Sequence, residues 1–486
     1  MSTPEKQKQV VIAGGGPAGL TAAHLLQGEA QVSLYEKSEM LGGISRTVAH
    51  HGNHIDIGGH RFFSKSSRVN DFWREVMPGM LTRPRVSRIY FLRRFFDYPV
   101  RLTPATLRRL GFKRTLRAGI GYIKSMLRKR PELSLEDFYI NRFGRPLYET
   151  FFEGFTEKVW GKHPSQLSAD WGAQRVKGLS LWGLVKDFVS KRMPWSSRRE
   201  VETSLIERFK YPPLGPGQLW ETVGAQALEA GAKVELNTGV ERIHLERGRV
   251  VGVTVRGADG VARRVECDEF ISSMPVSELI AALDGIDVPE DVRRVAAALP
   301  YRDFITVGLL VNRLKIKSEN GRGLIPDTWI YVQDSDVRLG RIQVFNNWSP
   351  RMVADPERHV WLGLEYFCNE GDELWEMTDD EMIQLAAAEL AKIGIIDSSE
   401  VTDAVRIRMP KAYPAYFGSY GEFDKVRAFL DTIPNLWCVG RNGQHRYNNM
   451  DHSMLTAMEA ADRIAAGDTD KAPLWNVNTD AAYHED

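Results

Sequence analysis

The chain has 486 residues, of which 43% are hydrophobic and 26% are charged, and its formal net charge is +1. One hydrophobic core supports roughly 250–300 residues, so this length predicts two or three domains. The near-neutral charge argues against a nucleic-acid partner, and no apolar run is long enough to cross a bilayer.

The N-terminal segment and the cysteines indicate the cellular compartment in which the protein is expected. Residues 1–8 are polar and lead directly into an apolar run, so we expect no signal peptide. Cys267, Cys368 and Cys438 have neither paired nor metal-type spacing. We therefore expect a cytoplasmic protein without a metal site, whose cysteines pack in the core.

A glycine-rich loop follows the first apolar run. Residues 9–13 (QVVIA) predict a buried parallel strand, and residues 20–26 predict a helix. In the intervening GGGPAG, one glycine permits the tight turn, one lets a pyrophosphate approach the backbone, and one lets helix and strand pack closely. This predicted phosphate loop comprises Gly14, Gly16, Pro17, Ala18 and Gly19.

An acidic residue stands where a nucleotide ribose would need one. A second predicted strand, residues 31–35, ends at Glu36, about 20 residues beyond the loop, where a carboxylate can accept hydrogen bonds from ribose hydroxyls. Together, the loop between strand and helix and the acid predict a dinucleotide-binding fold.

Two glycine pairs favour FAD over NAD. Gly42-Gly43 and Gly58-Gly59 resemble the pairs of the flavoprotein superfamily that includes amine oxidases, protoporphyrinogen oxidase and UDP-galactopyranose mutase. In that superfamily such glycines let the backbone run close to the flavin. The resemblance implies further cofactor contacts from Lys37, His60, Val240, Gly440, Arg441, Met450 and Ser453.

Later segments complete the predicted nucleotide domain. Residues 233–243 and 265–275 are expected to be strands, as are residues 435–439, with a helix beginning near Asp451. The dipole of that helix would stabilise negative charge on a reduced flavin. His452 is expected to help cap the helix.

Three motifs narrow the resemblance to one family. They are Trp160 followed by WGAQRV (residues 171–176), TWIY (residues 328–331) followed by Arg341, and Tyr413 followed by Tyr447 and Asn449. These motifs resemble those of UDP-galactopyranose mutases, particularly the longer, eukaryotic-type members. The resemblance follows the same order along the chain, from Val10 to about Ile464.

This resemblance implies a reaction without net redox change. In that family N5 of the reduced flavin attacks the anomeric carbon of a nucleotide sugar and expels the nucleoside diphosphate. The flavin–sugar adduct opens, the ring recloses through another hydroxyl, and the diphosphate returns. Such chemistry requires cations and hydroxyl donors for the diphosphate.

The resemblance assigns these roles to particular residues. Arg175 and Arg341 become the diphosphate clamp, and His60 lies on the flavin-facing loop. The expected substrate contacts are Tyr98, Trp160, Trp329, Tyr331, Tyr413, Tyr447 and Asn449. Structural roles remain open: Arg175 as a surface residue, Tyr331 as core, and His60 as a hydrogen-bonded core histidine.

The nucleotide pocket departs from the family pattern. Where the longer members carry Tyr-Pro-Phe-Gln, this chain has Tyr98-Pro99-Val100-Arg101, an expected Asn is Thr156, and a Gln beside the flavin is Met450. The altered base pocket leaves open a different nucleotide or a different leaving group.

Residues 102–130 form a basic, mostly helical stretch with no acidic residue, and Gly111 interrupts the predicted helix. Such a stretch is a solvated basic face, a peripheral contact with an anionic membrane, or a receptor for a polyprenyl-phosphate-linked sugar substrate.

We therefore predict an α+β flavoprotein, with a Rossmann-like FAD domain and inserted helical and antiparallel-sheet domains. The FAD domain takes residues 1–84, 194–299 and 410–470, the sheet domain 85–101 and 300–409, and the helical domain 102–193, with a tail over 471–486.

The leading functional hypothesis is an FAD-dependent mutase that interconverts pyranose and furanose forms of a nucleotide sugar. The alternative is an FAD-dependent oxidoreductase of the amine oxidase, desaturase or protoporphyrinogen oxidase type, which needs an apolar tunnel to the flavin. A flavoprotein that only partners other glycan enzymes has no positive support. A mutase requires a reductant, such as NAD(P)H or a reductase, and the oligomeric state is open.

Overall fold

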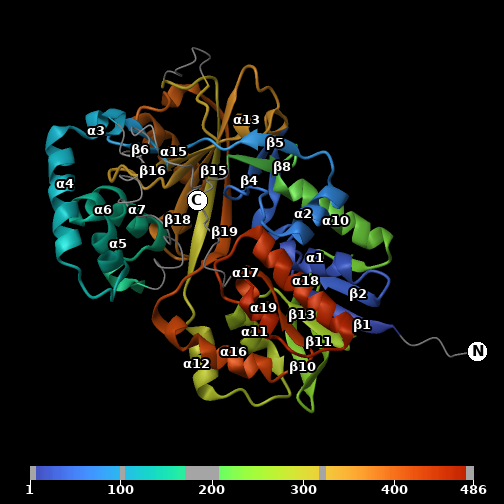
Figure 1. The fold of residues 1–486 in the computed structure, drawn as a ribbon. Helices are drawn as coiled ribbons and strands as arrows, with labels where there is room; N and C mark the ends of the chain where they lie inside the picture. The colour runs from blue at the N-terminus through green and yellow to red at the C-terminus, as the bar shows by residue number, and fades with distance from the viewer. Residues whose placement is uncertain (1–6, 99–103, 170–206, 317–323, 478–486) are drawn as a thin grey trace, which may run out of the picture.

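The computed structural model describes residues 7–98, 104–169, 207–316 and 324–477. Figure 1 shows a parallel-sheet part that contains both ends of the described chain, a second part built on a long antiparallel sheet, and a group of helices at one side. The observed mixture of helices and sheets confirms the predicted α+β class.

A five-stranded parallel sheet forms the first part. The apolar run after residue 8 becomes its central strand, because both faces of that strand are covered and its residues are buried. Each neighbouring pair in the sheet is parallel. The order is β20 (Leu436–Cys438), β13 (Glu269–Ser272), β1 (Lys8–Ala13), β2 (Ala30–Tyr35) and β9 (Lys233–Glu235).

Two hydrophobic clusters cover the faces of this sheet. Helices α1 (Pro17–Leu25), α10 (Pro216–Glu229) and α18 (Met450–Ala466) pack on one face, through Leu20, Leu219 and Met454 among others. The other face packs against a second sheet and α11 (Val276–Ala282), α12 (Glu290–Ala297) and α16 (Phe423–Asp431). The second sheet runs β12 (Ala262–Glu266), β11 (Arg249–Arg256), β10 (Gly239–Glu246) and β14 (Leu283–Asp284).

The predicted strands of residues 233–243 therefore divide between two sheets. The first joins the parallel sheet as β9, whereas β10 forms an antiparallel hairpin with β11. In β11, Val250, Val253 and Val255 are buried whereas Val251 and Thr254 are partly exposed, since mainly one face of the hairpin meets the core.

A seven-stranded sheet forms the second part. Its pairs are antiparallel except for β6 with β16, which is parallel. Helix α15 (Asp379–Lys392) packs on one face through Met382 and Ala386. The order is β19 (Val401–Pro414), β15 (Tyr301–Val311), β18 (Val360–Cys368), β17 (Arg341–Val344), β16 (Trp329–Val332), β6 (Ser87–Phe91) and β7 (Arg94–Asp97).

The helical part consists of short helices. Gly111, at φ +85°, interrupts the basic stretch as expected and separates the first two. The helices are α3 (Pro104–Leu110), α4 (Phe112–Leu127), α5 (Leu135–Phe143), α6 (Arg145–Phe151) and α7 (Glu153–Trp160).

Two cations join α7 to the seven-stranded sheet. Lys158 Nζ donates to the carbonyl oxygens of Val332, Asp334 and Leu339, at 3.2, 2.7 and 3.1 Å. Burial lowers the pKa of Lys158 to about 8. From the sheet, Arg302 Nε donates to the carbonyl of Val159 at 3.0 Å. These bonds fix the end of α7 against the strands that carry Trp329 and Arg341.

The predicted C-terminal tail contains a helix. Residues 472–476 form a helix, α19 (Ala472–Asn476), because Trp475 is buried against Phe423. The remaining elements are η1 (Gly43–Ser45), β3 (Thr47–His50), β4 (Asn53–Asp56), α2 (Ser67–Val76), β5 (Leu81–Pro84), η2 (Pro164–Gln166), β8 (Arg208–Tyr211), α13 (Phe345–Trp348), η3 (Pro350–Met352), α14 (Glu373–Glu376), η4 (Ser398–Glu400), η5 (Gly418–Glu422) and α17 (Gly440–Gly443).

Candidate functional site

A cavity of about 770 Å³ is lined by all three parts of the fold. It collects most of the residues singled out from sequence, although these are spread over more than 400 positions. Those that line it are Gly14, Gly16, Pro17, Ala18, Glu36, Lys37, Gly43, Gly58, Gly59, His60, Tyr98, Trp160, Val240, Trp329, Tyr331, Arg341, Tyr413, Gly440, Arg441, Tyr447, Asn449, Met450 and Ser453. Arg175 lies outside the described residues.

The phosphate loop lies at one end of the cavity. Gly14 has φ +105°, and a Cβ on Gly19 would lie 1.9 Å from the Gly14 carbonyl oxygen, so Gly19 serves the close packing of helix on strand. Gly42, at φ +98°, donates its N–H to the Gly15 carbonyl. Gly19 and Gly42 thus shape the loop from behind the cavity wall.

Glu36 is held in place by the loop itself. Its Oε2 accepts from the N–H of Gly15 at 2.7 Å, and its Oε1 accepts from the N–H and hydroxyl of Ser38 at 2.8 and 2.7 Å. A carboxylate has further lone pairs, so both oxygens can also accept from ribose hydroxyls.

The glycine pair Gly58-Gly59 forms a wall with Trp329. A Cβ on Gly59 would lie 2.7 Å from the Trp329 ring, so only glycine allows this approach. The ring of Trp329 stacks on that of Tyr331 at 5.9 Å, because the two lie on one face of β16. His60 Nε2 lies 3.0 Å from the Ile57 carbonyl, so His60 both lines the cavity and makes a structural bond.

Arg341 is the central charge of the sheet wall. Its Nη1 donates to Glu365 Oε2 at 3.1 Å, and the Glu365 side chain is buried whereas that of Arg341 is 12% exposed. Although burial opposes its charge, the Glu365 carboxylate outweighs that effect and the pKa of Arg341 lies above its ordinary value. The guanidinium carbon also lies 5.2 Å from the Trp329 ring and 4.9 Å from that of Phe367.

A tyrosine pair borders Arg341. The rings of Tyr413 and Tyr447 stack at 5.5 Å, and Trp160 meets both edge-on. Arg441 lies 4.7 Å from the Tyr447 ring and donates to the Ala412 and Asn448 carbonyls. Burial raises the pKa of Tyr413, so its hydroxyl remains a donor at neutral pH.

The N-terminus of α18 opens onto the cavity. Asn449 caps the helix, and its N–H donates to His452 Nδ1 at 3.3 Å, which confirms the capping role expected for His452. Asp451 accepts from Ser64 at 2.8 Å and Ser453 donates to Asn448 at 3.0 Å. The positive end of the helix dipole therefore lies beside Met450, where the wall offers no side-chain hydrogen bond.

Other parts of the lining were missed by the sequence analysis. Arg46 and Arg61 line the cavity but stand in no motif that marks them, and Glu365, the partner of Arg341 behind the wall, was not singled out either. An aromatic end of the cavity is built by α5, α6 and α7, whose aromatic residues resemble ordinary core positions in sequence. It comprises Tyr139, Phe143, Leu147, Phe151, Phe152 and Phe155.

The cavity fits a flavin by two structural criteria. Three buried nitrogen atoms on its lining residues, Nε1 of Trp329, Nε of Arg341 and Nε of Arg46, have no hydrogen-bond partner among the described residues. Buried donors of this kind need partners, which a polar ligand can supply. The Gly14 loop, Glu36 and the start of α18 provide the phosphate, ribose and helix-dipole contacts of a dinucleotide.

Comparison with known proteins identifies the class. The family model for flavin-containing amine oxidoreductases matches residues 17–465, and the chain belongs to this family. It is therefore a flavin-dependent enzyme of the amine oxidase superfamily, for which FAD is the typical cofactor.

Several solved structures share the fold. Reduced UDP-galactopyranose mutase superposes with a TM-score of 0.81 at 22% identity, over 98% of this chain and 99% of that one. A putative protoporphyrinogen oxidase from Exiguobacterium sp. 255-15 gives 0.69 at 17% identity, over 95% and 99%. A putrescine oxidase variant gives 0.61 at 17% identity, over 96% and 99%. The similarity to UDP-galactopyranose mutase expected from the motifs is thus confirmed for the fold.

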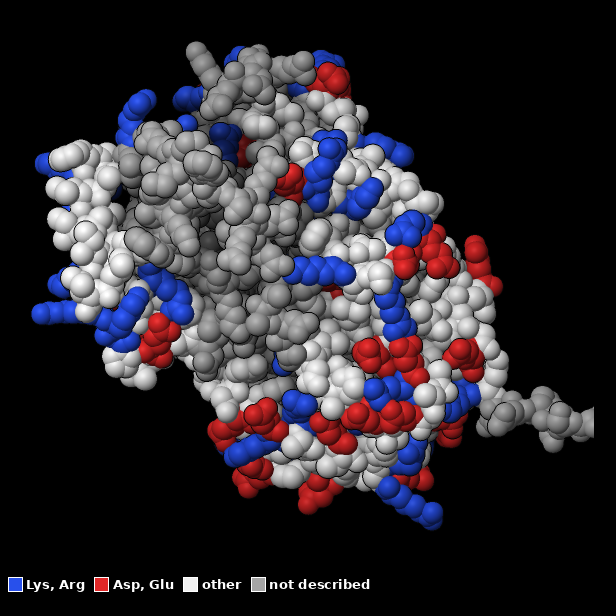
Figure 2. Space-filling model, in the orientation of Figure 1, with Lys and Arg blue, Asp and Glu red and all other residues white. Residues whose placement is uncertain are grey.

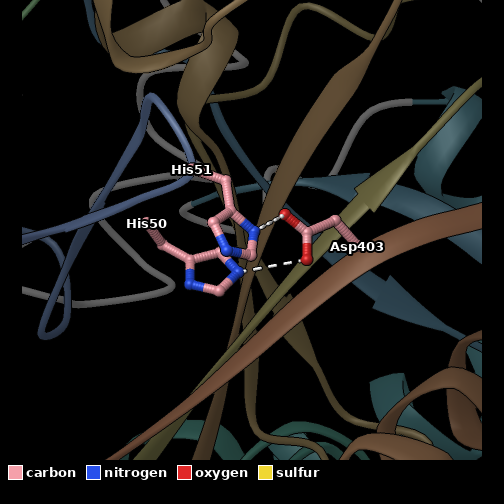
Figure 3. A group of neighbouring side chains, drawn as sticks. All are labelled: His50, His51 and Asp403. Atoms are coloured by element: carbon pink, nitrogen blue, oxygen red, sulfur yellow. Dashed lines mark hydrogen bonds and ion pairs between the residues drawn. The ribbon is translucent and has the colours of Figure 1, made fainter.

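His50, His51 and Asp403 form a polar cluster that lies away from the lining of this cavity. Figure 3 shows the rings of His50 and His51 facing the carboxylate of Asp403. His50 Nε2 lies 3.1 Å from Oδ1, and His51 Nδ1 lies 2.9 Å from Oδ2. These atoms could also hold a metal ion, but each facing nitrogen already has a hydrogen-bonding oxygen. The cluster joins the β3–β4 turn to β19.

Proposed function

We propose that the chain is an FAD-dependent mutase that interconverts pyranose and furanose forms of a nucleotide sugar without net redox change. The observation that carries the proposal is the position of Arg341. It lies on the cavity wall with Tyr331, Tyr413 and Tyr447, and its guanidinium carbon is 5.8 Å from the Tyr331 ring. Arginine with converging hydroxyls is a suitable receptor for a diphosphate.

Each residue would have a separate role in binding the diphosphate. Arg341 presents its fork to the diphosphate that leaves and returns, while Glu365 holds the guanidinium in position. The hydroxyls of Tyr413 and Tyr447 donate to the same group. The flavin, when bound and reduced, supplies the electron pair that the anomeric carbon accepts. Arg175 is proposed as the second cation.

The overall similarity to UDP-galactopyranose mutase supports this proposal, since the likeness extends over nearly the whole of both chains. The departures at Thr156 and Met450 both lie on the cavity lining. They favour a nucleotide other than UDP, or a lipid-linked sugar, as a variant of the same reaction.

A second candidate, a flavin-dependent oxidoreductase, is favoured by one observation. The aromatic end of the cavity provides the apolar passage that such an enzyme needs, and the solved structures with this fold include oxidases. In this reading Arg341 is matched by Glu365 and has a structural role.

One experiment separates the two. The purified protein is reduced anaerobically with dithionite, incubated with UDP-galactofuranose, and assayed by chromatography beside an oxidised sample. Conversion to the pyranose only in the reduced sample supports the mutase. If neither sample converts it, GDP- and dTDP-linked sugars and a polyprenyl-phosphate sugar are tested in the same way. Failure of all of these, with flavin reduction by an amine or porphyrinogen in stopped flow, would establish the oxidoreductase.

A further inference from the structure

Helix α4 exposes its apolar side chains and buries its small ones. Figure 1 places it at the outer edge of the helical part. Large hydrophobic residues recur at intervals of four and three positions, which sets them on one face of the helix. These residues, Phe112, Leu116, Ile120, Ile123 and Leu127, are between 52% and 81% exposed.

The face of α4 that packs on the protein is made of smaller residues. Thr115, Ala118 and Ser125 lie on this face, where Ser125 is buried, and Tyr122 is its one large side chain, packed against the core. Gly121 approaches α6 so closely that a Cβ would lie 2.3 Å from Pro146. The packing partners are α5 and α6. A helix in a water-soluble fold normally has the opposite arrangement, so the apolar stripe requires another partner.

The charged residues of the segment that carries the stripe are all basic. Residues 98–131 contain no aspartate or glutamate. Figure 2 shows lysine and arginine side chains projecting at the edge where Figure 1 places α4. The basic residues of α3, α4 and the segment that follows are Arg108, Arg109, Lys113, Arg114, Arg117, Lys124, Arg128, Lys129 and Arg130.

We propose that α4 docks the chain on the surface of an anionic phospholipid bilayer. The helix lies in the plane of the interface, with Phe112, Ile120 and Leu127 at the acyl boundary and the basic residues at the headgroup phosphates. Within the described residues no helix is sufficiently long and apolar to cross a bilayer, so the contact is peripheral. A second copy is disfavoured as the partner, because two uniformly basic faces repel each other.

Docking would also place one end of the cavity near the lipid. The helices under α4 carry Tyr139 and Phe143 on α5 and Leu147 and Phe151 on α6, which line the aromatic end. A substrate with an apolar or lipid-linked portion could therefore pass between bilayer and cavity over a short path.

The test is vesicle flotation of the full-length, flavin-loaded protein. Phosphatidylcholine vesicles with and without phosphatidylglycerol are compared at low and high salt. We expect flotation with the anionic vesicles, weaker at high salt. Ile120→Glu combined with Leu127→Glu should lower partitioning at least about tenfold. Val261→Glu, at an exposed apolar position on the β11–β12 loop, is the matched control and should float as the parent does.

Flavin absorbance and circular dichroism establish that each variant is folded. The proposal is overturned by absent flotation with anionic vesicles, by equal flotation with neutral ones, or by unchanged flotation of the double variant. An oligomer in analytical ultracentrifugation that the double variant dissociates, without vesicle binding, would instead assign the stripe to a second copy. None of these outcomes depends on which reaction the cavity performs.

Discussion

Arg341 on the cavity wall pairs with the buried Glu365 behind it, Nη1 to Oε2 at 3.1 Å. The register of β17 against β18 places the two residues directly opposite each other. Gln343 donates to the second carboxylate oxygen at 3.1 Å. The pair thus holds a guanidinium in a fixed position where a diphosphate would bind.

Arg341→Ala should abolish mutase turnover and also destabilise the fold. Removal of one partner leaves Glu365 buried without its counter-charge, at a cost of roughly 3–5 kcal/mol. Arg341→Ala combined with Glu365→Gln should recover much of the stability but no activity. Turnover and urea denaturation are measured together. Arg338→Ala, at an exposed residue before β17, is the control. Undiminished turnover in Arg341→Ala would exclude the diphosphate role.

Gly59→Ala should lower flavin occupancy. The added Cβ meets the Trp329 ring at 2.7 Å, so the ring must move along the cavity wall. The absorbance ratio of flavin to protein after purification measures occupancy. Gly79→Ala is the control, since a Cβ there meets nothing within 4 Å. Full flavin content in Gly59→Ala would show that this wall tolerates displacement.

Asp56 should make stability depend on pH. It is fully buried, and burial raises its pKa to about 7, although it accepts hydrogen bonds from Tyr211 and Thr47. Because the folded-state pKa lies above the ordinary value of 3.8, ionisation favours unfolding. The stability that protonated Asp56 contributes is complete below pH 3.8 and is lost as the pH rises to about 7.

Asp56→Asn cannot ionise and isolates this effect. Between the two pKa values, the free energy of unfolding of the parent should fall relative to the variant by about 1 kcal/mol per pH unit. Urea denaturation of both proteins at several pH values measures the difference. A difference that stays constant with pH would contradict the prediction.

The cluster of His50, His51 and Asp403 should stabilise the β3–β4 hairpin. Burial opposes ionisation of Asp403, but the hydrogen bonds from the two histidines outweigh it and lower its pKa. This contribution is present above the ordinary pKa of the carboxyl and is lost as pH falls below it. His50→Ala with His51→Ala should cost roughly 1 kcal/mol at neutral pH, given the exposure of His51.

Hydrogen exchange can locate this effect. Residues 47–56 should exchange faster in the double variant than in the parent, whereas His163→Ala, which removes a histidine–glutamate pair in the helical part, should leave them unchanged. If residues 47–56 exchange at the same rate in the His50→Ala, His51→Ala variant as in the parent, β3 and β4 are held by other contacts.

Much of the nucleotide half could be predicted from sequence because its signals are local. The strand, glycine loop and helix around Gly14 and the acid at Glu36 follow one another within a short stretch, and each residue type is required by backbone geometry or packing. The shared face of Trp329 and Tyr331 also followed from strand periodicity.

Other features depend on contacts between distant segments. Glu365 lies in a continuous apolar strand, and only the register of β18 with β17 makes it the partner of Arg341. From sequence, the region of α4 was predicted only as part of a basic, mostly helical stretch. Which of its faces meets the protein was decided by the contact of Gly121 with Pro146 on α6.

The sequence by itself determined the dinucleotide loop, through short-range backbone constraints, and it indicated the superfamily and most of the residues at the cavity through motifs that resemble those of known flavoproteins. Tertiary structure alone decided which charges are paired, which end of the cavity is apolar and which helix face is left exposed. The physical reason is that burial and charge pairing arise where distant segments pack together, and a short sequence pattern does not specify which segments these are.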